Sequence, residues 1–252
     1  MPGVLGVHLE GPFINPERNG AHPLANLLRP EPSDIDLLAS LGPAGVTLVT
    51  LAPERVPEGF IRALVDRGVR VCAGHSNATA AEMARAHSEG LSGVTHLFNA
   101  MSQLGSREPG VVGAAMSDLG LAAGIIADGH HVAWPSFQAA FRASGPQRMM
   151  LVTDAMATIG SARDAFELFG ETIRVSEGRL VNAEGRLAGA HLDMNAAILN
   201  AHRHGGATLA EALAMASTAP AAYLGLSGSH GRIAPGRKAI FSVLRTAALS
   251  SA

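Results

Sequence analysis

The chain has 252 residues, of which 47% are hydrophobic and only 4% aromatic, so it can bury a sizeable core that is mainly aliphatic. The formal net charge of −2 argues against a nucleic-acid partner and against a polybasic membrane surface. Cys72 is the only cysteine, which excludes an internal disulfide and fits a cytoplasmic protein. We expect no signal peptide before the first expected strand, and no apolar run is long enough to span a bilayer.

Short apolar runs alternate with stretches of helical spacing over the first part of the chain. Strands are expected at 4–7, 46–51, 69–73, 94–95, 121–127 and 149–153. Helices are expected at 35–41, 57–67, 79–89, 110–117 and 134–143, and a polar loop at 15–29. This alternation is typical of parallel βαβ units and favours an α/β fold of the TIM-barrel type.

Local signals mark where two of these helices begin. Ser33 and Asp34 are expected to cap the helix at 35–41. Thr79, followed three residues later by Glu82, predicts a capping box.

The rhythm changes after the last barrel strand. Turn formers at Gly170, Gly178 and Gly185 divide 166–189 into short strand-like pieces, so we expect inserted antiparallel hairpins. Helices at 194–204 and 209–215, a turn or two near 219–224 and a strand-like run at 240–244 complete the chain.

Three candidate metal ligands end three different strands. Glu10, His75 and His96 each follow an apolar run and precede a turn, which is where parallel barrels build their active sites. One carboxylate and two imidazoles with an open position form a catalytic zinc arrangement, in which a water becomes acidic enough to give hydroxide near neutral pH. The alternative for each histidine alone is a satisfied polar residue in a turn.

Four further residues are candidates for acid–base chemistry or substrate binding. Asp154 ends the last barrel strand and could take a proton from water and return it to a leaving group; the alternative is an Asx turn or a helix cap. His22, in the loop after Glu10, could stabilise an oxyanion or be a solvated loop histidine. Arg107 and His131 could hold an anionic group, although a lone arginine is more often a surface charge.

Six short motifs, spread over most of the chain, fit together in order and spacing. They are HLEGPF at 8–13, GHSNA at 74–78, THLFNAM at 95–101, DGHH at 128–131, TDA at 153–155 and LAG at 187–189. With them the chain resembles the N-acetylglucosamine-6-phosphate deacetylases of the amidohydrolase superfamily. The resemblance implies hydrolysis of the N-acetyl group of N-acetyl-D-glucosamine 6-phosphate to D-glucosamine 6-phosphate and acetate, by a homodimer acting on this small-molecule sugar phosphate.

The resemblance also implies a role for each matching residue. Glu10, His75 and His96 bind a divalent cation, most simply Zn2+, with Fe2+ or Co2+ as alternatives. Asp154 is the acid/base and His22 polarises the acetamide carbonyl. The substrate-binding residues implied are Ala21, His22, Asn99, Ala100, Arg107, His131, Leu187, Ala188 and Gly189. In the family, the arginine matching Arg107 reaches into the neighbouring subunit's site.

The chain departs from the family pattern at both ends. Family members carry a segment before the strand of Glu10 that supplies part of a β-sandwich and the first barrel strands. We therefore expect an incomplete barrel lacking its first strands, with a catalytic domain at 1–235 and a remnant of a β-sandwich strand and tail at 236–252. The alternatives are another amidohydrolase acting on a cyclic amide or a nucleobase, or a truncated remnant without catalysis.

Overall fold

The computed structural model describes residues 3–117 and 119–242. The chain divides into two compact units, Met1–Ala123 and Gly124–Ala252. The domain boundary expected at residues 235 and 236 is a different division of the chain and stays a prediction. Among the helices in the described ranges, none has both the length and the apolar character needed to cross a membrane.

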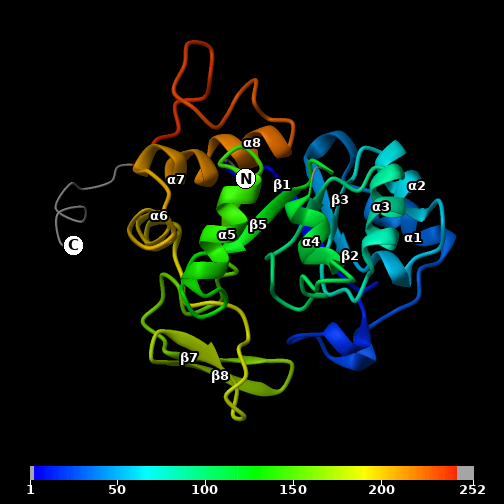
Figure 1. Cartoon of the computed structure of the whole chain (residues 1–252), viewed down its shortest axis with the longest axis horizontal. Helices are drawn as coiled ribbons and strands as arrows, with labels where there is room; N and C mark the ends of the chain where they lie inside the picture. Colours follow the sequence, from blue (N-terminus) through cyan, green and yellow to red (C-terminus); the bar gives the residue numbers. More distant parts are fainter. Residues whose placement is uncertain (1–2, 118, 243–252) are drawn as a thin grey trace. The chain divides into compact units, whose positions relative to one another are not determined.

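The first unit is built on parallel strands (Figure 1). They are β1 (Gly6–Glu10), β2 (Val46–Leu51), β3 (Arg70–Ala73) and β4 (Gly93–Val94), and β5 (Ala122–Ile126) begins where this unit ends. Each of these strands pairs in parallel with the next, and β6 (Met149–Val152) follows β5 in the sheet. Strand order equal to chain order is what successive βαβ units produce, as the sequence predicted.

The register of the first strands brings their carboxyl ends to one edge. Glu10 lies opposite Thr50, and Leu51 lies opposite Ala73, two residues before His75. The interior of β2 and β3 is fully buried at Val49, Leu51, Val71 and Ala73, as parallel strands covered on both faces require. Residues that follow β1 and β3 therefore emerge together at the same edge of the sheet.

Helices join the strands of the first unit. They are α1 (Pro32–Leu38), α2 (Phe60–Asp66), α3 (Ala80–Ser88) and α4 (Gly110–Met116), with one-turn 3-10 helices η1 (Pro16–Arg18), η2 (Leu24–Asn26), η3 (Gly42–Ala44) and η4 (Pro53–Arg55). The capping box predicted for α3 is confirmed, because Thr79 Oγ1 accepts from Glu82 N at 3.2 Å and Thr79 N donates to Glu82 Oε2 at 2.8 Å.

Two expectations for the first unit are corrected. The helix predicted at 35–41 begins three residues earlier, at Pro32, and ends at Leu38. Glu31 N donates to Asp34 Oδ2 at 2.7 Å, and a proline is favoured in the first turn, so the helix starts one turn before the predicted cap. The loop predicted at 15–29 contains η1 and η2.

The second unit combines helices with an antiparallel sheet. Its elements after β5 are α5 (Trp134–Ser144), β6, the antiparallel strands β7 (Ala165–Leu168), β8 (Glu171–Ser176) and β9 (Arg179–Val181), and helices α6 (Met194–Arg203), α7 (Leu209–Ala216) and α8 (Thr218–Tyr223). Helices α6, α7 and α8 pack against β6. The predicted hairpins and helices are confirmed. The strand predicted at 240–244 is wrong for 240–242, and 243–244 lies outside the described residues.

Candidate metal centre and active site

Three side chains from the ends of β1, β3 and β4 meet in the first unit. The Nε2 atoms of His75 and His96 lie 3.3 and 2.9 Å from Glu10 Oε1, and 3.1 Å from each other. Both histidines are buried, with 5% and 6% of their surface exposed, and Glu10 is half-buried. The structure thus brings the three predicted ligands together, and their binding of a metal stays a prediction.

The contacts of His75 show which of its ring nitrogens is available. Nδ1 lies 2.6 Å from the carbonyl oxygen of Arg18, which can only accept a hydrogen bond, so Nδ1 carries the hydrogen. In the neutral ring, Nε2 then presents a lone pair toward a carboxylate oxygen of Glu10 and the Nε2 atom of His96.

Electron-rich atoms this close repel one another unless protons or a cation lie between them. Two imidazole nitrogens and a carboxylate are borderline ligands of the kind that zinc, iron and cobalt accept, and a backbone carbonyl behind a ligating imidazole is a common support for such sites. The cluster of Glu10, His75 and His96, called the ligand cluster below, therefore fits a divalent cation.

The charge state of Glu10 also suits a metal ligand. Burial alone would raise the pKa of this carboxyl, but hydrogen bonds with His22, His75 and His96, and the charge of His96, hold the pKa well below its usual range. The carboxylate is therefore ionised at neutral pH.

The backbone turns sharply at the residues that follow the strands. His75, His96 and Asp154 have φ angles of 49°, 32° and 50°, in the left-handed region that side-chain-bearing residues rarely adopt. Each lies two residues after the end of its strand: β3, β4 or β6. Strained backbone of this kind concentrates at functional sites, where surrounding contacts hold it in place.

His22 lies beside the ligand cluster. Its Nε2 is 3.7 Å from Glu10 Oε2, and its ring meets that of His75 edge to face, with 4.9 Å between centroids. Ligand atoms of Glu10, His22 and His75 lie within 4.8 Å of one another, so His22 is near enough to contact a bound cation or a group attached to it. Gly20 (φ 58°) allows this loop to approach, because an added Cβ would lie 3.0 Å from Cε1 of His75.

The other predicted substrate-binding residues of the first unit lie in loops at the same strand ends. Asn99 Nδ2 donates to the carbonyl oxygens of His96 and Leu97, at 3.3 Å in each case. The carbonyl of Ala100 accepts from Ser76 N at 3.0 Å. Ala21 and Arg107 are exposed.

Asp154 and 187–189 belong to the second unit. Asp154 is half-buried, and its carbonyl accepts from Ala190 N at 2.8 Å, which fixes its backbone against the segment after the antiparallel sheet. Ala188 is buried with Ile173 and Leu180 in the small core of that sheet. Gly189 (φ 68°) sits where a Cβ would clash with Met156 at 2.3 Å.

His131 is paired with Asp128 in the same unit. Its Nδ1 lies 2.6 Å from Asp128 Oδ2, and both side chains are largely buried. Burial alone would raise the pKa of Asp128, but hydrogen bonds from the His131 side chain and backbone, the charge of His131 and the His130 N–H bring it below the usual value. The Nδ1 atom of His131 is therefore engaged with Asp128, and a substrate-binding role for this histidine stays a prediction.

Two of these supporting groups were missed by sequence reasoning. Asp128 was recognised as a strand end but not as the partner of His131, although three-residue spacing was a signal that could have found it. No sequence pattern could have identified the carbonyl of Arg18 as the partner of His75, because every residue carries a backbone carbonyl. Only the fold determines which carbonyl lies beside Nδ1.

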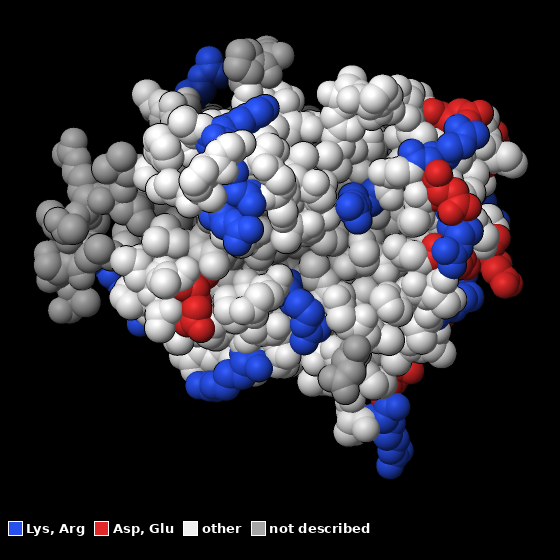
Figure 2. Space-filling model, turned by 90° about the horizontal axis from the view of Figure 1, so that it is seen from above, with Lys and Arg blue, Asp and Glu red and all other residues white. Residues whose placement is uncertain are grey.

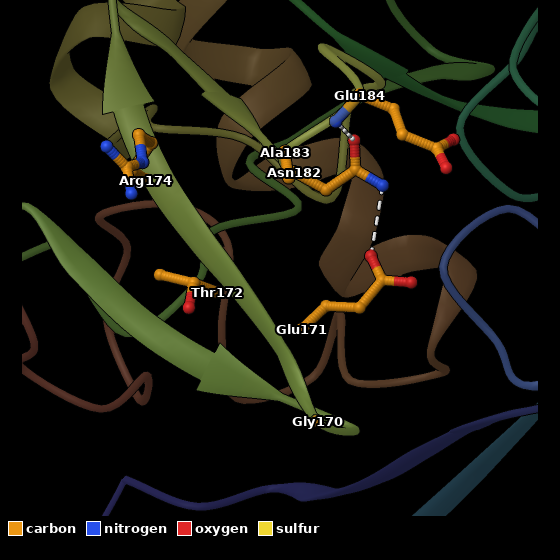
Figure 3. A pocket seen from close by; sticks show the side chains of 7 residues that line it. All are labelled: Gly170, Glu171, Thr172, Arg174, Asn182, Ala183 and Glu184. Atoms are coloured by element: carbon orange, nitrogen blue, oxygen red, sulfur yellow. Dashed lines mark hydrogen bonds between the residues drawn. The ribbon is translucent and has the colours of Figure 1, made fainter.

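Two surface features outside the ligand cluster are the distribution of basic side chains and a hollow over the antiparallel sheet. On the face drawn in Figure 2, lysines and arginines lie in several separate groups rather than one continuous basic stripe. A hollow of about 630 Å³ lies over the antiparallel sheet, lined by Gly170, Glu171, Thr172, Arg174, Asn182, Ala183 and Glu184 (Figure 3). There Asn182 Nδ2 donates to Glu171 Oε2 at 3.0 Å, and none of the predicted site residues lines the hollow.

Comparison with known proteins decides the family. The profile of the amidohydrolase family matches residues 3–251. The chain belongs to the amidohydrolase family. It is 42% identical over 241 residues to the N-acetylgalactosamine-6-phosphate deacetylase of Shewanella sp. (strain ANA-3), covering 95% of this chain and 60% of that protein. It is 41% identical over 253 residues to the N-acetylglucosamine-6-phosphate deacetylase of Homo sapiens, covering 96% and 61%.

Solved structures agree with this assignment. The N-acetylglucosamine-6-phosphate deacetylase of Pasteurella multocida superposes with a TM-score of 0.88 at 34% identity, covering 94% of this chain and 62% of that one. A variant of the Mycobacterium smegmatis enzyme in complex with N-acetyl-D-glucosamine-6-phosphate superposes with a TM-score of 0.84 at 34% identity. The match covers 92% of this chain and 62% of that chain. The fold class, a partial (β/α) barrel of the amidohydrolase type, is thereby confirmed. The chain spans about 60% of the length of these relatives.

Proposed function

We propose that this amidohydrolase performs metal-dependent hydrolysis of the N-acetyl group of N-acetyl-D-glucosamine 6-phosphate, giving D-glucosamine 6-phosphate and acetate. The observation that carries the proposal is the ligand cluster, in which the Nε2 atoms of His75 and His96 lie within 3.3 Å of one carboxylate oxygen of Glu10. The names of the relatives support the substrate class.

The three residues of the ligand cluster would hold the cation, with Zn2+ first and Fe2+ or Co2+ as alternatives. When bound, the cation supplies positive charge that polarises the amide carbonyl and makes a water molecule more acidic. His22 Nε2 donates a hydrogen bond to the carbonyl oxygen, where negative charge develops as the water attacks.

Asp154 is proposed as the acid/base. Its carboxylate accepts a proton from the attacking water, and the resulting carboxylic acid donates that proton to the amide nitrogen, so that D-glucosamine 6-phosphate leaves with a neutral amino group. The support is local: Asp154 follows β6 in the left-handed conformation that His75 and His96 adopt after β3 and β4.

The sugar phosphate is proposed to lie against Ala21, Asn99, Ala100, His131 and the segment 187–189. Arg107 is exposed, and its planar guanidinium suits a phosphate. As the family resemblance implies, we propose that Arg107 serves the site of a second copy in a homodimer. We place this reaction in the cytoplasm. A free cysteine is stable in that reducing compartment, and a phosphorylated sugar is a typical cytoplasmic metabolite.

The test is acetate release from N-acetyl-D-glucosamine 6-phosphate, measured together with the metal content of the purified protein. We expect turnover that a chelator abolishes and that added Zn2+ or Co2+ restores. Metal-loaded protein that binds the sugar phosphate without releasing acetate would refute the proposal and favour a binding role.

The 4-epimer is a second candidate substrate. Relatives named N-acetylgalactosamine-6-phosphate deacetylases, from Shewanella sp. (strain ANA-3) and Escherichia coli O157:H7, are 42% and 38% identical to this chain. A kcat/KM at least tenfold higher for N-acetyl-D-galactosamine 6-phosphate in the same assay would favour it.

A further inference from the structure

The carboxylate of Glu54 joins three segments near the ligand cluster. It lies in η4, directly after β2, the strand between those that supply Glu10 and His75. Its Oε1 accepts hydrogen bonds from Asn15 Nδ2 at 2.9 Å and from Asn77 N at 2.7 Å. Its Oε2 accepts from Ser76 Oγ at 2.7 Å.

Two of these donors follow His75 directly in the chain. His75 has a φ of 49°, so its backbone keeps this conformation only if neighbouring contacts hold it. Glu54 holds the next two residues, Ser76 through its hydroxyl and Asn77 through its N–H. The direction in which the His75 side chain leaves the backbone is thereby fixed.

The third donor fixes the other side of the same imidazole. Asn15 N donates to the carbonyl of His75 at 2.8 Å, and Arg18 N donates to the carbonyl of Asn15 at 2.9 Å. This turn places the Arg18 carbonyl oxygen where it accepts the hydrogen bond from Nδ1 of His75. Arg18 Nε also donates to Asn77 Oδ1 at 2.6 Å, which closes the network.

We propose that Glu54 is a positioning residue for the metal ligand His75. One carboxylate sets both the backbone of His75 and the carbonyl that selects its tautomer, so that Nε2 faces Glu10 and His96. The inference rests on the proposed function only in taking the ligand cluster as the metal site. Groups that orient a ligating histidine typically change metal affinity about 10–100-fold when they are removed.

The turn that carries Glu54 has an anchor of its own. Arg85 Nη2 donates to the carbonyl of Pro53 at 2.9 Å, from helix α3. Substitution of Glu54 therefore removes the link to 15–18 and 75–77 while this anchor of η4 remains.

The experiment measures Co2+ binding, through its visible absorption spectrum and by competition with a chelator, in the full-length chain. We expect Glu54→Ala to weaken Co2+ binding about 10–100-fold and to change the absorption band, at a temperature where the metal-free variant is folded. Glu54→Gln should recover most of the affinity, because its amide oxygen can accept from Asn15 and Asn77 while its NH2 group donates to the Ser76 hydroxyl. Co2+ affinity and spectrum equal to wild type in folded Glu54→Ala would overturn the proposal.

Two further variants keep the test decisive. Glu82→Gln is the matched control, since Glu82 is a half-buried carboxylate that holds Thr79 at the start of α3, and it should leave Co2+ affinity unchanged. If Glu54→Ala does not fold, Ser76→Ala removes a single donor to Glu54 and should weaken Co2+ binding at least threefold; unchanged affinity would overturn the proposal.

A separate arm distinguishes failure of the proposed function. If Co2+ binds wild type and Glu10→Ala equally, the ligand cluster is not the metal site. That result would refute both the proposed function and the positioning role of Glu54. Co2+ bound at the ligand cluster without acetate release would refute the proposed function alone.

Discussion

The two units each contain a carboxylate in contact with imidazole, and they use opposite nitrogens. In the ligand cluster, Nδ1 of His75 is held by a backbone carbonyl and Nε2 faces Glu10. In the second unit, Nδ1 of His131 faces Asp128, which leaves Nε2 outside the pair.

Both sites pair a carboxylate with an imidazole, so the residue types alone do not distinguish them. The imidazole nitrogen that faces the carboxylate indicates whether the site suits a metal ion or orients a ring. Glu10 meets the Nε2 atoms of two imidazoles, an arrangement that favours a shared cation. Asp128 meets one imidazole through Nδ1, together with backbone N–H groups of the same turn, an arrangement that orients the ring. Four predictions test the roles assigned to the two units, and two of them include a second variant for comparison.

The largest effect is expected from Glu10→Ala. Removing the carboxylate should leave two imidazoles that cannot retain a divalent cation through dialysis, so that metal content and acetate release fall to background. His131→Ala is the counterpart in the other unit and should keep its metal while KM rises. Glu10→Ala protein with a full equivalent of metal would break the contrast.

Asp154→Asn should lower kcat by about 10²–10⁴-fold, because the amide cannot accept the proton of the attacking water. Metal content should equal that of wild type, since Asp154 is not among the proposed ligands. Steady-state acetate release beside elemental analysis measures both, and loss of metal in this variant would contradict the assigned role.

Asp128→Asn should cost about 1–3 kcal/mol of unfolding free energy at neutral pH, as expected for a largely buried hydrogen bond to a charged group. The folded-state pKa of Asp128 lies below its ordinary value, so its contribution is present above the unfolded pKa of about 3.9 and is lost as pH falls through the folded value. Urea unfolding of wild type and variant, repeated at decreasing pH, should therefore show the difference shrinking below about pH 4. A difference that grows on acidification would exclude this pairing.

Gly20→Ala should have the smallest effect and bear on the ligand cluster alone. An alanine in the left-handed backbone conformation of Gly20 adds about 1–2 kcal/mol of strain. The Cβ of that alanine would also press on the ring of His75. Gly42→Ala is the control, because Gly42 also has a positive φ (48°) but has nothing within 4 Å of an added Cβ. Thermal unfolding should show a similar loss of stability for both, and only Gly20→Ala should weaken Co2+ binding.

Local signals placed most of the elements correctly. The capping box of Thr79 and Glu82 and the hairpins of the second unit depend on residues close together in the chain. The helix predicted at 35–41 was misplaced because two start signals compete there, and the earlier one, formed by Glu31 with Asp34 beside Pro32, prevails.

The sequence by itself determined which residues end the strands, and hence that Glu10, His75 and His96 are candidates for one site. Strand breaks and helix caps are local, so residue order is enough to find them. Only the tertiary structure decided how these side chains are supported, through the Arg18 carbonyl and the carboxylate of Glu54. Those contacts join segments 22 to 57 residues apart, and such pairings depend on the packing of strands rather than on any neighbouring residue.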